Sequence, residues 1–391
     1  MTFLIFVLGL AQCIFFGALY SLAIRNRQRA WQELDALSRL VPGAWPSLGL
    51  VIPMAGDDPR MREAVTSLIN QNYENFSVVL VTAESKEPAA ILAASLAAIY
   101  PHVRHICAGN ARNCGQKNWN ILAGIAALPD VDLYAFCDST HLAEPVFLRA
   151  LAFPLATGQS SFSVGYHRVT PMTNSLPDLA YAFCVLFMGF MQGIRALCQP
   201  WGGAMAIEAN AFRDHMIADL WRHSVVDDCS LAAYLQNHGL RAQFCPAAML
   251  ITIPGNINFS WWLSWLERQV LFLKFCIPAQ WTLLGCVCAM LLLPPVFFVI
   301  ALGGDLLGIT GGAAPLLALL WLAALCASIG PWRSFLPAPV TVTRWLLAYA
   351  VGCAGFGIAY GRSIPAKVIS WRGISYQVCR GGIVRSVHVQ K

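Results

Sequence analysis

Four long tracts without a charged residue stand out from an otherwise mixed sequence, at positions 1–23, 275–304, 306–332 and 345–361. A helix that crosses a membrane needs about 20 consecutive apolar residues. The first three tracts exceed this length and the fourth falls just short of it. We therefore expect an N-terminal membrane anchor and a membrane region in the last third of the chain.

Between the first two tracts, short apolar runs alternate with stretches of helical spacing. The pattern predicts strands at 48–53, 76–81, 103–107 and 133–137, and helices at 61–70, 89–100 and 118–128. Strands and helices that alternate in this way are typical of an α/β domain with a parallel sheet and crossover helices. The ligand site of such a sheet lies beyond the carboxyl ends of its strands. Glu84, Lys117 and Asp138 fall at those ends.

Composition and charge support this division. The chain has 57% hydrophobic and 12% charged residues, against about 45–50% apolar and about 25% charged in an ordinary soluble domain. Disorder is thereby excluded, and a purely soluble protein is not expected. The basic residues Arg25, Arg27 and Arg29 follow the first tract instead of preceding it. This arrangement favours a retained anchor over a signal peptide and places the following residues on the cytoplasmic side.

The basic C-terminal tail complicates the topology. Asp305 is the only acidic residue from position 275 onward, and the tail carries Arg362, Lys367, Arg372, Arg380, Arg385 and Lys391. Such a tail favours the cytoplasm or an anionic lipid surface, yet three C-terminal crossings would leave it outside. Two alternatives remain open: the fourth tract lies in the interface, or Pro294 and Pro295 split the second tract into a re-entrant hairpin. We expect the tail inside.

These patterns predict five regions. They are an N-terminal anchor (1–24), a cytoplasmic domain (45–258), an interfacial amphipathic helix rich in tryptophan (259–275), a C-terminal membrane region (276–361) and a basic cytoplasmic tail (362–391). The 14 cysteines form no CxxC pair, so neither a disulfide framework nor a zinc site is expected. The GxGxxG and GxxxxGK[ST] elements are also missing, which gives no support to a dinucleotide oxidoreductase or a P-loop NTPase.

Several short motifs are each weak alone, but their order and spacing together are a specific signal. They are Ile52-Pro53-Met54-Ala55-Gly56-Asp57-Asp58-Pro59, Cys114-Gly115-Gln116-Lys117-Asn118-Trp119-Asn120, Cys137-Asp138-Ser139-Thr140, Trp201-Gly202-Gly203-Ala204, Val226-Asp227-Asp228 and Ser370-Trp371-Arg372-Gly373. Over roughly residues 45 to 385 the chain resembles membrane-bound glycosyltransferases of family 2, in the branch that includes the ceramide glucosyltransferases of family 21. The resemblance implies a Rossmann-like α/β domain of the GT-A type that binds a nucleotide sugar, with transmembrane helices at both ends.

The resemblance implies a donor site. Glu84 stands where the family has an aspartate that contacts the base, although a solvated loop carboxylate is the alternative. Lys117 precedes a predicted helix, and its charge suits an anionic nucleotide; it could equally be a surface lysine. Asn120 would hold the ribose or the loop. The remaining donor-site residues that we expect are Pro53, Ser139, Gly203 and Arg268.

Asp138 stands where the family binds a divalent cation, Mg²⁺ or Mn²⁺. Such an ion would bridge the carboxylate and the diphosphate and so neutralise the leaving group. Thr140 occupies the position of the second carboxylate of the family motif. The ceramide branch also tends to lack this second carboxylate. His141 could supply a ligand, or it could simply be a polar residue of a turn.

Asp227 and Asp228 begin a predicted helix, where an aspartate can also serve as an N-cap. In the family the second acid of this pair is the general base, which takes the proton from the acceptor hydroxyl. The resemblance therefore implies that Asp228 is catalytic and that Asp227 supports it. A single displacement with inversion at the anomeric carbon would follow.

The acceptor side is less clearly marked. Trp201 could stack on a sugar or simply pack, and Trp371 and Arg372 match a cytoplasmic segment near the family's active site. Of the family's Gln-x-x-Arg-Trp motif only Arg268 is present. Its guanidinium group could still bind the pyrophosphate. The loss of the other motif residues weakens the case for polymer synthesis.

We therefore expect an inverting hexosyltransferase that uses a UDP-sugar and a lipid acceptor such as a ceramide, a hopanoid or sterol-like lipid, or diacylglycerol. A polysaccharide synthase and an inactive membrane scaffold are the alternatives. The protein is expected in a membrane, most simply the bacterial cytoplasmic membrane, with its active site on the cytoplasmic side. No nucleic-acid partner is expected, and the sequence leaves the oligomeric state open.

Overall fold

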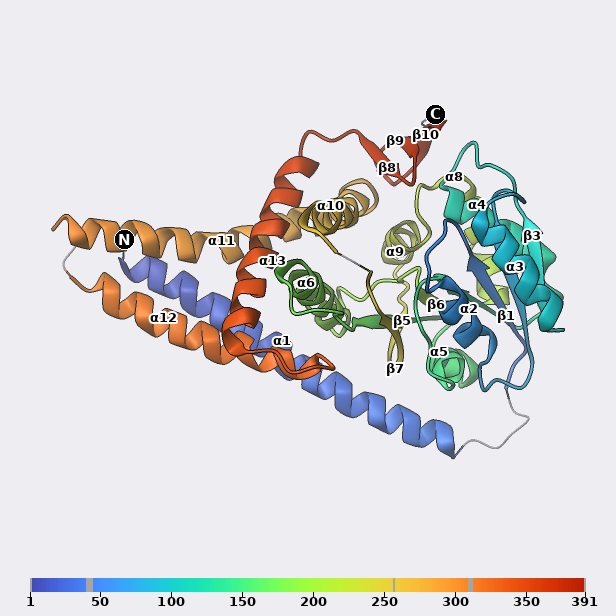
Figure 1. Ribbon diagram of the computed structural model, residues 1–391, viewed down its shortest axis with the longest axis horizontal. Coiled ribbons are helices and arrows are strands. Elements are labelled where there is room, and N and C mark those ends of the chain that lie inside the picture. The colour runs from blue at the N-terminus through green and yellow to red at the C-terminus, as the bar shows by residue number, and fades with distance from the viewer. Residues whose placement is uncertain (1, 40–44, 256, 309–311, 390–391) are drawn as a thin grey trace.

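The computed structural model describes residues 2–39, 45–255, 257–308 and 312–389. Met1 of the predicted anchor and Lys391 of the predicted tail lie outside these ranges. An α/β domain occupies one side of the molecule, and long apolar helices extend from it on the other side (Figure 1). The predicted α/β domain with apolar helices near both ends of the chain is confirmed.

The α/β domain is built on a seven-stranded sheet with the order β3-β2-β1-β4-β6-β5-β7. The first four strands in this order are parallel, as predicted, whereas β6 runs antiparallel to both β4 and β5. The strands are β1 (Leu48–Pro53), β2 (Phe76–Thr82), β3 (Val103–Cys107), β4 (Leu133–Cys137), β5 (Phe162–Val169), β6 (Ala204–Glu208) and β7 (Gln243–Thr252). The sheet is therefore mixed, with a parallel half that the sequence pattern anticipates.

Helices cover both faces of this sheet. They are α2 (Met61–Ile69), α3 (Pro88–Ile99), α4 (Gln116–Ala127), α5 (Phe147–Ala156), α6 (Leu176–Gln192), α7 (Ala209–Asp214), α8 (Ile217–His223) and α9 (Asp227–Asn237). Successive residues of a strand point to opposite faces. Val51 accordingly belongs to the same core as Ile121 of α4, whereas its neighbour Ile52 packs in a second core with Met61 of α2. Burial on both faces explains the unbroken apolar runs of these strands.

Within the part of the chain that the structure describes, four helices are long and apolar enough to cross a membrane, which fits an integral membrane protein. They are α1 (Thr2–Ser38), α11 (Pro278–Leu306), α12 (Ala314–Ile329, continued by the 3₁₀ helix η1, Gly330–Phe335) and α13 (Val342–Ser363). Helix α11 continues through Pro294 and Pro295, so the structure has no hairpin at this proline pair. Helix α1 extends well past residue 24, and Glu33 in its second half accepts a hydrogen bond from the Ala247 amide of the α/β domain (3.0 Å).

A layer of helices and a small second sheet connect the two parts. Helix α13 packs against α6 and α10 (Phe259–Cys276), the helix predicted at 259–275. The second sheet has the antiparallel order β10-β9-β8 and consists of β8 (Val368–Trp371), β9 (Ile374–Val378) and β10 (Val384–Val389). It docks on the α/β domain, because the Val225 amide donates to Gly382 O (2.9 Å) and the Gln116 amide donates to Tyr376 Oη (3.3 Å). The C-terminal tail therefore lies beside the starts of α4 and α9.

Candidate active site

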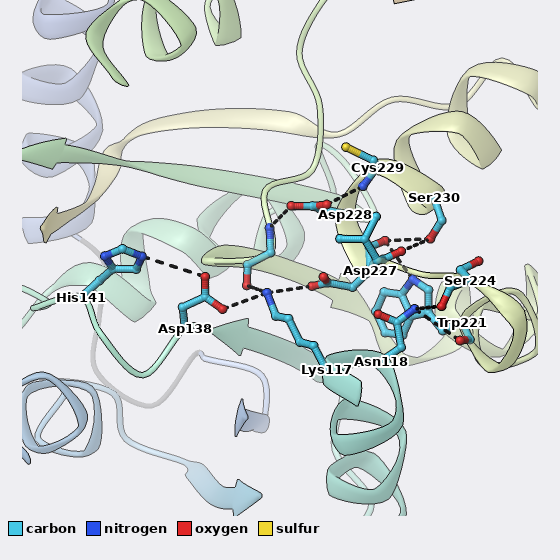
Figure 2. Close-up of polar contacts among 12 residues, drawn as sticks. Lys117, Asn118, Asp138, His141, Trp221, Ser224, Asp227, Asp228, Cys229 and Ser230 are labelled. Carbon is cyan, nitrogen blue, oxygen red and sulfur yellow. Dashed lines mark hydrogen bonds and ion pairs between the residues drawn. The ribbon is translucent and has the colours of Figure 1, made fainter. Parts of the chain in front are cut away.

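Four segments of the α/β domain meet at one edge of the sheet. Asp138 follows β4, Lys117 lies in the first turn of α4, and Asp227 and Asp228 form the first two residues of α9. Gly202 lies in the turn before β6. Figure 2 shows the four side chains converging there. This edge is at the carboxyl ends of the parallel strands β1 and β4, where the sequence predicts a ligand site.

Lys117 is the centre of this cluster. Its ammonium group lies 2.8 Å from Asp138 Oδ1 and 3.2 Å from Asp227 Oδ2, and it donates to Gly202 O at 3.0 Å. The Gly202 carbonyl accepts one proton of the ammonium group, and the two carboxylates form ion pairs with it. The alternative of a solvated surface lysine is therefore wrong, since the side chain is only 12% exposed.

The surrounding charges determine which groups are ionised. Burial alone would lower the pKa of Lys117, but the charges of Asp138, Asp227 and Asp228 outweigh burial and raise the pKa above its ordinary value. Burial raises the pKa of Asp227 to about 6; Lys117 opposes this shift, and Asp228 and Asp138 add to it. Lys117 is thus a fixed positive charge at neutral pH, and Asp227 is its buried counter-charge.

The two adjacent aspartates have different environments. Asp227 is fully buried, and its Oδ1 atom has no hydrogen-bond partner. Asp228 is half-buried; its Oδ2 accepts from the Gly202 amide (3.0 Å) and its Oδ1 from the Cys229 amide (2.6 Å). Neither aspartate is the N-cap of α9, because Val226 occupies that position. Asp228 is therefore the member of the pair that a substrate can reach.

Two glycines allow these segments to approach so closely. A Cβ atom at Gly202 would lie 2.4 Å from Asp227 Oδ2 and 2.5 Å from Lys117 Nζ. A Cβ atom at Gly115, the residue before α4, would lie 2.1 Å from Val225 O. Such distances are far below van der Waals contact, so both positions require the smallest residue.

Aromatic and imidazole rings form the wall opposite Lys117. Trp201 stacks on His167, with ring centroids 4.5 Å apart and an interplanar angle of 10°. The Thr252 hydroxyl lies between two rings, 2.5 Å from His167 Nδ1 and 2.8 Å from His141 Nδ1. Burial lowers the pKa of both histidines, so both rings are neutral at neutral pH.

A pair of arginines flanks Trp371 near the same space. The guanidinium carbon of Arg268 lies 5.5 Å from the Trp371 ring centroid, and that of Arg372 lies 5.8 Å from it. Arg372 also donates to Ala55 O, after β1. Burial, with the nearby charge of Arg372, lowers the pKa of Arg268 to about 10. Arg268 is partly buried and Arg372 is exposed. Two positive charges near one ring favour an anion beside them.

One cavity of about 330 Å³ connects these groups. Its polar end is lined by Lys117, Asp138, Asp227, Asp228 and Arg268, together with Trp201 and Trp371. Its other end is lined by apolar side chains of α6, α11 and α13, which include Met188, Met191, Leu283, Leu284, Val287 and Phe356. A charged site and the apolar helices thus share a single continuous space.

Other predicted donor-site residues lie outside the lining of this cavity. Pro53 ends β1, and Glu84 follows β2, where its carboxylate accepts from Asn110 Nδ2 (2.9 Å). Asn120 is buried and accepts from Gln116 Nε2 (2.8 Å), which also donates to Gly109 O (2.9 Å). Holding the ribose and holding the loop were the two roles predicted for Asn120, and its contacts fit the second. Ser139 is buried, and Gly203 lies against the Trp201 indole.

Several residues in or near the cavity could not be found from the sequence. His167 lies on β5 and Thr252 at the end of β7, two strands that the hydrophobic pattern did not identify. Asn118 is buried and donates to Ser224 O (3.1 Å), which joins α4 to the segment before α9. The one signal for Asn118 in the sequence was its place in the same motif as Lys117.

The carboxylate of Asp138 could bind a divalent cation together with a phosphate group of a ligand. Asp138 has a side chain that is 35% exposed and lines the cavity. Among the described residues, no group of three or more His, Cys, Asp or Glu side chains is arranged to hold a metal ion. Mg²⁺ is commonly bound through one or two carboxylates plus substrate phosphates. The arrangement fits that mode of binding.

Comparisons with known proteins identify the family of the chain. Residues 46–264 match the family model described as glycosyltransferase like family 2. Among solved structures, the mannosyltransferase PcManGT from Pyrobaculum calidifontis, in complex with GDP-Man and Mn²⁺, is 14% identical, with 90% of this chain and 97% of that chain covered and a TM-score of 0.49. Glucosyl-3-phosphoglycerate synthase from Mycobacterium tuberculosis, in complex with phosphoglyceric acid, is 14% identical, with 59% and 79% covered and a TM-score of 0.36. A comparison with curated protein sequences finds no match.

Proposed function

Because this chain belongs to the glycosyltransferases of the family 2-like group, we propose that it transfers a hexose from a UDP-sugar to the hydroxyl group of a membrane lipid, with inversion. The observation that carries this proposal is the single cavity that joins the Lys117–Asp228 cluster to apolar side chains of α6, α11 and α13. A soluble acceptor would not need an apolar half of this kind. A lipid of the ceramide, hopanoid or diacylglycerol type would place its hydroxyl at the polar end and its hydrocarbon at the other.

The polar end supplies the groups that a nucleotide sugar requires. Lys117 and Arg268 carry positive charge into the cavity, and both suit the oxygens of a diphosphate. Arg372 reaches the same region through its contact with the Trp371 ring. A divalent cation bound by Asp138 and the diphosphate would neutralise charge on the leaving group. Glu84, which follows β2, would accept a hydrogen bond from the N–H of a uracil ring.

Asp228 has the environment of a general base. Its two backbone N–H donors hold the carboxylate in one orientation. It would accept the proton of the lipid hydroxyl while that oxygen attacks the anomeric carbon. The bond between that carbon and the β-phosphate oxygen breaks in the same step, and the nucleoside diphosphate leaves. Asp227 serves by fixing Lys117.

The membrane helices place the enzyme where its acceptor resides. The anchor at 1–24 and the membrane region at 276–361 would hold the domain at 45–258 against the bilayer. The Arg25–Arg29 cluster and the basic tail at 362–391 support a cytoplasmic active site in a bacterial cytoplasmic membrane. Helix α10 carries Trp261 and Trp265, and tryptophan favours the level of the lipid headgroups.

The test is a transfer assay on the full-length protein in detergent or lipid nanodiscs. Labelled UDP-sugars and a lipid extract should give a labelled product that dissolves in organic solvent, with release of UDP. Asp228→Asn should lower turnover by about 10²–10⁴-fold while UDP binding persists. Asp219→Asn is the matched control, because this side chain is 69% exposed and pairs only with Arg222 on the surface.

Other outcomes would favour other functions. A labelled polymer that resists lipid extraction would indicate a polysaccharide synthase. If the wild-type protein neither transfers nor hydrolyses any UDP-sugar, an inactive scaffold becomes the better explanation. Full activity of Asp228→Asn would show that the general base is another group.

A further inference from the structure

His141 faces Asp138 from the side opposite Lys117. Asp138 Oδ1 pairs with the Lys117 ammonium group at 2.8 Å, whereas Asp138 Oδ2 lies 3.9 Å from His141 Nε2 (Figure 2). The His141 ring is 8% exposed and lines the cavity. A buried imidazole nitrogen is thus directed at the free oxygen of the carboxylate that we assign to the cation.

The other ring nitrogen of His141 is held in place. Nδ1 lies 2.8 Å from the Thr252 hydroxyl, which has one proton to give and can accept from another donor. When Thr252 donates to His167 Nδ1 at 2.5 Å, it accepts from His141 Nδ1–H, and the Nε2 lone pair then faces Asp138. A ring fixed through its second nitrogen is the usual arrangement of a histidine that binds a metal ion.

The chain also lacks a second carboxylate close to Asp138 in the sequence. Thr140 stands two residues after Asp138, where a second carboxylate would otherwise supply an oxygen ligand. We propose that His141 Nε2 is the second protein ligand of the divalent cation held by Asp138. The inference rests on the proposed function, since the donor's diphosphate would complete the coordination. An imidazole ligand favours Mn²⁺ over Mg²⁺, which strongly prefers oxygen ligands.

Electron paramagnetic resonance of Mn²⁺ with the full-length protein and UDP tests this without any transfer reaction. Bound Mn²⁺ should show hyperfine coupling to one imidazole ¹⁴N. His141→Gln should abolish this coupling and weaken Mn²⁺ binding by about tenfold or more. His141→Asp should restore Mn²⁺ binding without the coupling and should improve binding of Mg²⁺ relative to Mn²⁺.

His167→Gln is the matched control. His167 contacts the Thr252 hydroxyl as His141 does, whereas the imidazole beside Asp138 is that of His141. This variant should keep the ¹⁴N coupling. Persistence of the coupling in His141→Gln, or its absence from wild-type protein that binds Mn²⁺ and UDP, would overturn the assignment. Failure of lipid transfer alone would leave it intact, so the two proposals can fail separately.

A second and independent inference concerns α13, which is long and apolar enough to cross a membrane. Both of its ends are tied to the same side of the molecule. At its start, Arg344 donates to Asn174 O in the α/β domain (2.9 Å). At its end, Lys274 of α10 donates to the carbonyl oxygens of Ser363, Ile364 and Ala366 at 2.7–2.8 Å.

Helices α1, α11 and α12 have a different arrangement. They lie alongside one another, whereas α13 runs across them beside α6 and α10 (Figure 1). The start of α1, the end of α11 and the start of α12 lie together at the end far from the α/β domain (Figure 1). Asp305, in the last turn of α11, accepts from the amides of Gly312 (3.0 Å) and Ala314 (2.9 Å). A charged residue at this tip fits emergence into water.

We infer that α1, α11 and α12 cross the membrane and that α13 lies in the membrane interface. Its outward positions include Leu347 and Ile358, each about half exposed, which suit the boundary between lipid headgroups and hydrocarbon. Three crossings then return the chain to the side of the α/β domain. This explains how the basic tail reaches Ala55 and Val225, residues of the catalytic domain.

Epitope tags in the full chain test the topology in sealed membrane vesicles of known orientation. A tag inserted at Ala338, just before α13, and a tag after Lys391 should be accessible from the same side. A tag in the α11–α12 turn at Gly308 and an N-terminal tag should be accessible from the opposite side. Only tagged proteins that elute as a single species from size-exclusion chromatography are scored. Accessibility of the Ala338 and C-terminal tags from opposite sides would show that α13 crosses.

Discussion

Two buried polar clusters show how differently the halves of this protein use polar groups. In the α/β domain, Lys117 is surrounded by charged partners, and Asp138 and Asp228 among them remain open to a cavity. Among the apolar helices, Gln12 is completely buried and neutral. Its Nε2 donates to Leu291 O (3.1 Å) and Tyr349 Oη (2.9 Å), and its Oε1 accepts from Trp321 Nε1 (3.1 Å). The first cluster keeps groups available for a ligand, whereas the second uses every group to join four helices.

The comparison predicts the largest loss for Lys117→Met. The substitution leaves Asp227 buried without its counter-charge, and breaking a buried ion pair in this way costs about 3–5 kcal/mol. We expect a marked drop in the thermal unfolding temperature of the detergent-solubilised protein and loss of UDP binding. The double variant Lys117→Met/Asp227→Asn should recover much of the stability but no activity, since the positive charge is still missing. An unchanged melting temperature in the single variant would contradict the ion-pair assignment.

Gly202→Ala should have the next largest effect. The added Cβ atom would lie within 2.5 Å of both Asp227 Oδ2 and Lys117 Nζ, so one of these groups must move. Overpacking of this kind costs about 1–3 kcal/mol, and turnover should fall with stability because the Gly202 amide also holds Asp228. Gly255→Ala is the control, because a Cβ atom there would meet nothing within 4 Å. Equal effects of the two substitutions would argue against a tight approach at Gly202.

Acidification should switch off the Lys117 cluster without unfolding the domain. The pKa of Asp227 is raised by burial to about 6, so below that pH Asp227 takes up a proton and ceases to balance Lys117. We expect kcat/KM to fall about tenfold per pH unit below pH 6.

Because the folded-state pKa is raised, the contribution of Asp227 to stability is greatest below its ordinary pKa and is lost as pH rises through about 6. Asp227 itself therefore does not promote unfolding between pH 4 and 6, and circular dichroism over this range should show an intact fold. An activity profile that stays flat down to pH 4.5 would contradict the prediction.

The same contrast explains what the sequence could predict. Strands β1 to β4 were found because they are buried on both faces and form unbroken apolar runs, and their ends correctly located Lys117 and Asp138. Strands β5 to β7 were missed, since β6 pairs antiparallel with strands distant in sequence and β5 carries polar residues such as His167. The small sheet of the tail was missed because its short strands are stabilised by docking near Tyr376 and Gly382. The charge of the tail predicted only its side of the membrane, whereas its contacts with the α/β domain depend on tertiary packing.

Gln12→Leu should have the smallest effect and should leave catalysis unchanged. The substitution removes three interhelical hydrogen bonds, and it leaves Trp321 Nε1 and Tyr349 Oη without these contacts to α1. Interhelical hydrogen bonds in membranes contribute only about 0.6 kcal/mol on average, so we expect a melting temperature lowered by a few degrees and an unchanged KM for the donor. Gln28→Leu on the exposed surface of the same helix is the control and should leave the melting temperature unchanged. If Gln12→Leu instead lowered turnover as much as Gly202→Ala, the membrane helices would be coupled to the Lys117 cluster, and the separation between a saturated structural cluster and an open functional one would fail.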